Sequence, residues 1–253
     1  MLNLKPIGFF HSPQIEPYQA GRQPDELGSF GRIELLPGQN YEQALQDLAG
    51  CSHIWIIFGF HHNEKWKPLT QTPRSDRKIG VFATRAPYRP NPLGLSAVRL
   101  LAVSDLRIEV AENDLLDGSP IYDIKPYHPE SDAIAEASIG WLENTTVTKN
   151  KINFSPVAEG QIEFLEVHGL KEIKPFILRQ LEFDPTNKNK KRVEEKLGYF
   201  TIAYRTWRID FTLADSVVGI LQVHSGYSPA ELLDFTDHYA DKKLHQLFNL
   251  QYT

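Results

Sequence analysis

The stretch Asp117–Tyr127 carries side chains that could handle protons and hold a charged ligand. It begins with an Asp-Gly-Ser-Pro turn and continues as a strand-like segment. Because side chains alternate along a strand, we expect Asp123, Lys125 and Tyr127 on one face, with Tyr122 and the intervening residues on the other. An acid, an amine and a phenol in one row could move a proton. Alternatively, Asp123 and Lys125 form only an exposed ion pair, worth less than about 1 kcal/mol.

A second stretch, Arg85–Ser96, contains three prolines within six residues. Proline fixes the backbone angle φ, so this loop is expected to be stiff before any ligand binds. Arg89 presents a planar donor fork that suits a carboxylate or a phosphate. Gly94 would let the backbone approach a ligand closely. The competing interpretation is a proline-rich turn between strands, with Arg89 in solvent.

Two adjacent histidines, His61 and His62, follow the apolar run Ile54–Phe60. Neighbouring residues on a strand point to opposite faces, so the two rings are not expected to share a metal. The chain has a single cysteine, Cys51, and shows no paired ligand spacing elsewhere. The sequence therefore predicts neither a metal site nor a disulfide framework.

The elements that would position these residues are mainly short strands in the first 145 residues. The clearest candidates are Ile7–Phe10, Gly31–Leu35, Ile54–Phe60, Ile79–Ala83, Ala97–Val103 and Leu106–Val110. One short helix is predicted at about Tyr41–Leu48. Strands and helices do not alternate, and no Gly-x-Gly-x-x-Gly turn joins a strand to a helix, which argues against a doubly wound sheet. The sequence predicts a mainly β fold, with strands that are covered on both faces or close a barrel.

The polar segment Asn144–Pro156 lacks periodicity and is predicted to link two domains, residues 1–145 and 155–253. Beyond it, apolar residues at helical spacing are followed by a polar loop and two strand-like runs, Gly198–Leu213 and Val217–His224. Ser228-Pro229 is typical of a helix start, and the helix is expected over Pro229–Tyr239. This second part is predicted to be a small α+β domain.

Charge is distributed unevenly along the 253 residues, whose net charge is -5. Residues 70–100 hold six cations and one anion, and residues 171–213 hold ten cations and six anions. Two basic segments on an acidic background suit a local polyanion site, although solvated loops would give the same pattern. The N-terminal residues do not resemble a signal peptide, and no apolar run is long enough to span a bilayer, so we expect a cytoplasmic protein without a membrane partner.

Taken together, the segments resemble the TrmO family, also called the YaeB-like or TsaA-like proteins. The matching pieces are His11-Ser-Pro, Arg22-Gln-Pro, Ser52-His-Ile-Trp-Ile with Phe60-His61, Gly80-Val-Phe-Ala-Thr-Arg, Arg89-Pro-Asn-Pro-Leu-Gly-Leu-Ser and Asp117–Tyr127. They cover about the first 130 residues. Ser119 stands where the family pattern has threonine, and it keeps the hydroxyl.

The resemblance implies a β-barrel that forms a homodimer and binds S-adenosyl-L-methionine near the subunit interface. By motif match, the cofactor-binding residues would be Arg22, Gln23, His61, His62, Arg89, Arg99, Leu100, Asp117, Gly118, Ser119, Pro120, Ile121 and Tyr122. The catalytic candidates are Asp123, Lys125 and Tyr127, for proton handling or substrate placement.

The implied reaction is methylation of the exocyclic N(6) of threonylcarbamoyl-adenosine at position 37 of tRNA, beside the anticodon. The loops Thr70–Lys78 and Lys188–Arg192 could supply cations for the anticodon loop. Two alternatives remain open at the level of sequence. One is a non-catalytic module that binds S-adenosylmethionine or RNA, and the other is a methyltransferase acting on another substrate.

Overall fold

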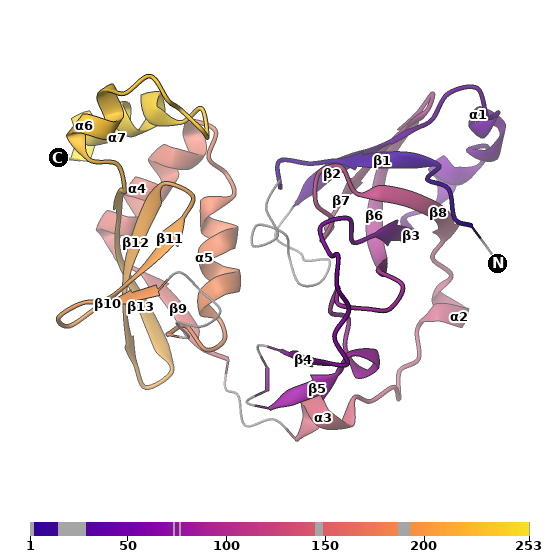
Figure 1. Cartoon of the computed structure of the whole chain (residues 1–253), viewed down its shortest axis with the longest axis horizontal. Helices are drawn as coiled ribbons and strands as arrows, with labels where there is room; N and C mark the ends of the chain where they lie inside the picture. The colour runs from indigo at the N-terminus through magenta and orange to yellow at the C-terminus, as the bar shows by residue number, and fades with distance from the viewer. Residues whose placement is uncertain are drawn as a thin grey trace. The chain divides into compact units, whose positions relative to one another are not determined.

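The structure is a computed structural model that describes residues 3–14, 29–72, 74–75, 77–144, 149–186 and 193–252. The chain divides into two compact units, Met1–Thr145 and Thr146–Thr253 (Figure 1). The first is a β-barrel and the second is a sheet with helices, so the predicted mainly β fold with an α+β C-terminal part is confirmed. No helix among the described residues is long and apolar enough to cross a membrane.

Six strands close the barrel in the order β1-β2-β7-β6-β3-β8. Their bounds are Gly8–His11 for β1, Phe30–Leu35 for β2, His53–Gly59 for β3, Leu93–Ser104 for β6, Arg107–Ala111 for β7 and Pro120–Pro126 for β8. Every neighbouring pair runs antiparallel. A separate two-stranded sheet pairs β4 (Leu69–Gln71) with β5 (Lys78–Gly80). Closure leaves the barrel without a free sheet edge.

Alternate residues of each strand fill the barrel. In β3, Ile54, Ile56 and Phe58 are buried, whereas Trp55 and Ile57 on the outer face are only half-buried. The almost continuously apolar run therefore has one face in the core and one face outside. The other buried members of this core are Phe10, Ile33, Leu35, Val98, Ile108, Val110, Leu115 and Ile121.

Gly94 has a packing role that was not predicted from the sequence. It lies directly opposite Phe58 in the pairing of β3 with β6. A Cβ atom at Gly94 would overlap the Phe58 ring. The absence of a side chain at this position thus makes room for the largest side chain of β3 that points into the core.

Short helical segments interrupt the strands of the first unit. They are α1 (Tyr41–Ala44), η1 (Leu48–Gly50), η2 (Val81–Ala83), α2 (Pro129–Asp132) and α3 (Gly140–Glu143). The helix predicted at Tyr41–Leu48 ends at Ala44, and Asp47, in a left-handed conformation with φ 65°, begins the separate turn of 3-10 helix η1. The strand predicted at Ile79–Ala83 is wrong beyond Gly80, where a turn of 3-10 helix begins.

In its described residues, the second unit is a five-stranded sheet in the order β10-β11-β12-β13-β9, accompanied by helices (Figure 1). The strands are β9 (Lys151–Phe154), β10 (Val193–Glu195), β11 (Phe200–Tyr204), β12 (Trp207–Ala214) and β13 (Val217–Ser225). The helices are α4 (Pro156–Val167), α5 (Ile173–Leu181), α6 (Pro229–Leu233) and α7 (Lys242–Tyr252).

Three sequence expectations for this unit need correction. The run Gly198–Leu213 is two strands separated by a tight turn, with Arg205 at φ 51°. The segment Asn144–Pro156 includes β9, which pairs in parallel with β13. The helix expected over Pro229–Tyr239 ends at Leu233.

Candidate cofactor and catalytic site

Several of the predicted site residues meet at one end of the barrel. The last residue of β3, Gly59, pairs with Leu93, the first residue of β6. Phe58 pairs with Ile121 near the start of β8, and Pro120 in turn pairs with Phe9 of β1. This antiparallel register gathers the histidine pair, the proline-rich loop and the Asp117–Tyr122 segment at the same rim.

The Asp-Gly-Ser turn is fastened to β1 by backbone hydrogen bonds. Gly118 has φ 74°, a backbone conformation that glycine adopts readily and other residues rarely adopt. Its N–H donates to the Phe10 carbonyl at 2.8 Å, and the Asp117 N–H donates to the Gln14 carbonyl at 2.8 Å. The Asp117 carboxylate accepts from the Ser12 N–H at 3.1 Å. The turn is therefore held in place by main-chain contacts, and the Asp117 carboxylate remains 40% exposed.

His61 and His62 lie beside this turn, and their arrangement differs from the prediction. β3 ends at Gly59, so the two rings do not alternate across a strand but lie side by side with centroids 4.1 Å apart. His61 Nδ1 is 3.5 Å from the buried Ser119 hydroxyl. Partial burial, together with the neighbouring His62, lowers the pKa of His61. A neutral imidazole that can accept a hydrogen bond is thus favoured at the rim.

Within the described ranges, no group of three or more His, Cys, Asp or Glu side chains is placed to hold a metal ion.

Arg89 lies half-buried in the proline-rich loop and organises its surroundings. Its Nη1 donates to the carbonyls of Val81 at 3.0 Å and Thr84 at 2.8 Å. The guanidinium carbon also lies 5.7 Å from the centroid of the Phe82 ring. One edge of the donor fork thus ties the loop to η2, which leaves only the other edge for a ligand carboxylate.

Asp123 and Lys125 share the outer face of β8, as the alternation predicts. Their side chains form an ion pair at 2.8 Å, and the Asp123 carboxylate also accepts from the Ile124 N–H at 2.9 Å. Tyr127 follows the strand, with its ring 5.5 Å from that of Trp55 on β3. The row of acid, amine and phenol is present, and its catalytic role stays a prediction.

Tyr122 does not share a face with Ile124, because β8 contains a bulge. Ile57 pairs with Asp123 and Phe58 pairs with Ile121, so the register skips Tyr122. As a result, Ile121 and Ile124 both pack in the core. Tyr122 lies instead next to Gly59, where a Cβ atom would come within 3.0 Å of its ring, so the glycine makes room for this side chain. The bulge turns the phenol of Tyr122 toward the rim.

Within one chain, Arg99 and Leu100 lie away from this rim. Arg99 pairs with His53 at the opposite end of β3 and forms an ion pair with Glu112 at 2.9 Å. Arg99 is six residues further along β6 than Leu93, a distance of about 20 Å. Leu100 packs against the barrel core, and its N–H donates to the Ser52 carbonyl. Of the other predicted positions, Arg22, Gln23 and the loop Lys188–Arg192 lie outside the described residues.

Two neighbours of the site were not chosen from the sequence as binding residues. His11 Nδ1 lies 3.7 Å from the Asp117 carboxylate. Gln14 is 5% exposed, and its side-chain oxygen is buried without a hydrogen-bond partner among the described residues. An unsatisfied buried acceptor is costly unless another group meets it. The available signal was the His11-Ser-Pro motif, which lies directly before Gln14.

Comparison with known proteins assigns the class of the barrel. Residues 9–133 match the family model described as the tRNA-methyltransferase O N-terminal domain. A probable S-adenosyl-L-methionine-binding protein from Pyrococcus abyssi is 42% identical over 145 residues, which cover 56% of this chain and 77% of that protein.

The similarity extends beyond the barrel. The Escherichia coli K12 protein named tRNA (adenine(37)-N6)-methyltransferase is 32% identical over 216 residues, 82% of this chain and 89% of that protein. The crystal structure of TrmO from Pseudomonas aeruginosa superposes with a TM-score of 0.65 at 29% identity, covering 89% of this chain and 99% of that one. The chain therefore belongs to the TrmO family.

Proposed function

We propose that this protein is an S-adenosylmethionine-dependent methyltransferase that modifies the exocyclic N(6) of threonylcarbamoyl-adenosine at position 37 of tRNA. The observation that carries the proposal is the alignment over 89% of the E. coli tRNA (adenine(37)-N6)-methyltransferase, which includes both the barrel and most of the second unit. A tRNA substrate also accords with the expected cytoplasmic location.

The residues at the rim fit the cofactor. S-Adenosylmethionine carries a sulfonium cation, a ribose with two hydroxyls, an amino-acid carboxylate and an adenine, and when bound it supplies an electrophilic methyl group. The half-exposed Asp117 carboxylate can accept from hydroxyl or ammonium groups. The Gln14 oxygen, which has no hydrogen-bond partner among the described residues, offers a further acceptor, and the edge of Arg89 that does not bind the Val81 and Thr84 carbonyls suits a carboxylate.

Asp123 and Lys125 serve the substrate in this proposal. The N(6) nitrogen belongs to a urea-like group and is a poor nucleophile, so a base must remove its proton while the nitrogen is held in line with the methyl group. Asp123 is the acceptor of that proton. Lys125, at 2.8 Å, holds the carboxylate in place, and Tyr127 gives an aromatic surface beside Trp55.

The active form is proposed to be a homodimer. On one barrel, Arg99 is about 20 Å of strand away from the rim that holds His61, whereas the resemblance places both in one cofactor site. A second copy that brings its Arg99 to the first copy's rim would satisfy both. Mixing an Arg99→Ala protein with a His61→Ala protein tests this arrangement. A mixture that is more active than either variant alone supports a shared site, and a mixture that is no more active excludes it.

The function is tested by nucleoside analysis of tRNA from cells with and without this protein, together with transfer of labelled methyl groups to purified tRNA. We expect label in N(6)-methylated threonylcarbamoyl-adenosine and none in tRNA that lacks the threonylcarbamoyl group. Label in adenosine without the threonylcarbamoyl group would show that the substrate is unmodified adenosine instead. Cofactor binding without transfer to any tRNA would favour the non-catalytic alternative.

A further inference from the structure

The sheet of the second unit has one helix-covered face and one polar face. α4, α5 and α7 all contact the same side: the Gln161 side chain accepts from the Val223 N–H at 2.7 Å, and the ring of Phe176 lies 4.6 Å from that of Tyr204. On α7, the His245 ring stacks on Trp207. Because strand residues alternate, the residues between these point to the opposite face.

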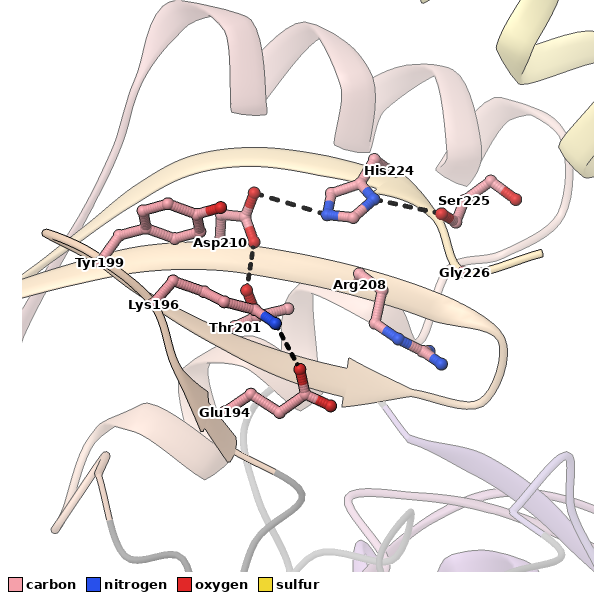
Figure 2. A pocket seen from close by; sticks show the side chains of 9 residues that line it. All are labelled: Glu194, Lys196, Tyr199, Thr201, Arg208, Asp210, His224, Ser225 and Gly226. Atoms are coloured by element: carbon pink, nitrogen blue, oxygen red, sulfur yellow. Dashed lines mark hydrogen bonds and ion pairs between the residues drawn. The ribbon is translucent and has the colours of Figure 1, made fainter. Parts of the chain in front are cut away.

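That opposite face carries a pocket of about 280 Å³, drawn in Figure 2. The register brings Glu194, Thr201 and Asp210 into one row across β10, β11 and β12. A second row pairs Arg208 of β12 with His224 of β13. All five side chains line the pocket, which is therefore built from charged and hydroxyl groups on four adjacent strands.

Asp210 forms the floor and is 3% exposed. One of its oxygens accepts from the Thr201 hydroxyl at 2.6 Å, and the other accepts from the Gln222 amide at 2.9 Å and lies 3.4 Å from His224 Nε2. His224 Nδ1 lies 3.1 Å from the Ser225 carbonyl. Both ring nitrogens thus face groups that only accept, which favours the doubly protonated ring, and the hydrogen bond to Asp210 raises the pKa of His224.

The charges in the pocket do not cancel. Asp210 balances His224, and Lys196 forms an ion pair with Glu194 at 2.7 Å. Arg208 adds a third basic group to a lining that has two carboxylates. Its Nη1 donates to the carbonyls of Arg205 and Trp207, and its charge also interacts with Glu194 and, outside the pocket, with Glu231. It lies directly across from His224, which carries a like charge when its ring is protonated. Like charges opposite one another destabilise a sheet, and an anion between them would relieve the repulsion.

We propose that this pocket binds one nucleotide of a single-stranded segment of tRNA, with a phosphate at Arg208 and a base against Tyr199. The half-buried Tyr199 lines the same pocket as Arg208 and Lys196. Cations that follow a backbone, next to an aromatic ring on which a base can stack, are the usual elements of single-strand recognition. The inference rests on the proposed function for the identity of the RNA, and it gives the second unit a role in holding the substrate.

The test measures tRNA affinity of the full chain without cofactor, so it does not depend on methyl transfer. Arg208→Gln should weaken binding of purified bulk tRNA about tenfold, since it removes a charge-assisted contact. It should also flatten the dependence of affinity on salt by about 0.7 on the logarithmic scale, the value for one lost phosphate contact on a single strand. Arg208→Lys, which keeps the charge, should retain most of the slope and provides a second variant if the glutamine protein does not fold.

The ring is tested separately. Tyr199→Leu should weaken binding at least about fivefold with an unchanged salt slope, whereas Tyr199→Phe should bind like the wild type. Lys243→Ala removes a cation from α7, away from the pocket, and is the control for the loss of one charge.

Unchanged affinity and slope for folded Arg208→Gln would overturn the proposal. A charge effect without a ring effect would reduce the pocket to an anion site and overturn the nucleotide assignment. If wild-type protein binds tRNA through these residues but transfers no methyl group, the proposed function fails while the binding site stands. If the wild type transfers methyl groups to tRNA and the variants bind tRNA normally, the binding-site proposal fails while the proposed function stands.

Discussion

Replacing Lys125 with alanine separates a catalytic role from a structural one. The Lys125 side chain is 59% exposed and its partner Asp123 is 46% exposed, so their ion pair should contribute less than about 1 kcal/mol to folding. Cofactor affinity should stay within about tenfold, or roughly 1.4 kcal/mol. If the pair handles the substrate proton, methyl transfer should fall by about 100-fold or more.

The assay is single-turnover methyl transfer to tRNA at saturating cofactor, with cofactor binding measured by calorimetry on the same preparation. Asp123→Asn is the companion variant, because its amide oxygen can still accept from the Ile124 N–H while the charge is lost. Arg107→Ala is the matched control: it breaks an exposed ion pair with Glu34 on another part of the barrel. Parallel losses of binding and turnover in the Lys125 variant would place the residue in the cofactor shell. Turnover within about threefold of the control would remove it from the chemistry.

Three further variants test the proline-rich loop, the barrel core and the pocket of the second unit. Arg89→Ala should weaken cofactor binding by about 1.5–3 kcal/mol in calorimetry, and because it frees two carbonyls it should also lower the thermal unfolding temperature. Gly94→Ala should destabilise the fold by about 1–3 kcal/mol in denaturant unfolding, since the new methyl group meets Phe58. Asp210→Asn tests the pocket floor by comparing its unfolding free energy with that of the wild type across pH. Burial opposes ionisation of Asp210, but the hydrogen bonds from His224, Thr201 and Gln222 hold the pKa of Asp210 below its ordinary value of 3.8. The hydrogen bond to Asp210 in turn raises the pKa of His224 above its ordinary value of 6.5. The loss of unfolding free energy in the variant should therefore be largest between about pH 3.8 and 6.5. It should shrink as the pH falls through the lowered pKa of Asp210 or rises through the raised pKa of His224.

Periodicity and turn residues were enough to predict most of the barrel. The strands from Ile7, Gly31, Ile54 and Leu106 lie within one residue of their predicted bounds, because each is a short run with apolar residues close to Gly, Pro or Asp turn positions. β9 was missed because Lys-Ile-Asn-Phe is too short and polar to stand out, and because its partner β13 lies far along the chain. Pairing between distant segments leaves no local pattern.

The site was predictable where it follows local alternation and not where the backbone departs from it. Asp123 and Lys125 are on one face, as expected. Tyr122 is displaced by a bulge, and the rings of His61 and His62 lie side by side because β3 ends at Gly59, before either histidine. Bulges and strand ends depend on the partner strand, which a single sequence does not specify. The distance of Arg99 from the rim likewise follows from the antiparallel register.

The contact between Phe58 and Gly94 constrains how this sequence can vary. The two positions face each other across β3 and β6, and one occupies the volume that the other leaves free. A mutation that adds a side chain at 94 becomes tolerable only after the ring at 58 has been replaced by something smaller. Phe58→Leu should therefore restore part of the stability lost in Gly94→Ala, although each change is harmful alone. Among descendants of this protein, we expect the two residues to change together or not at all.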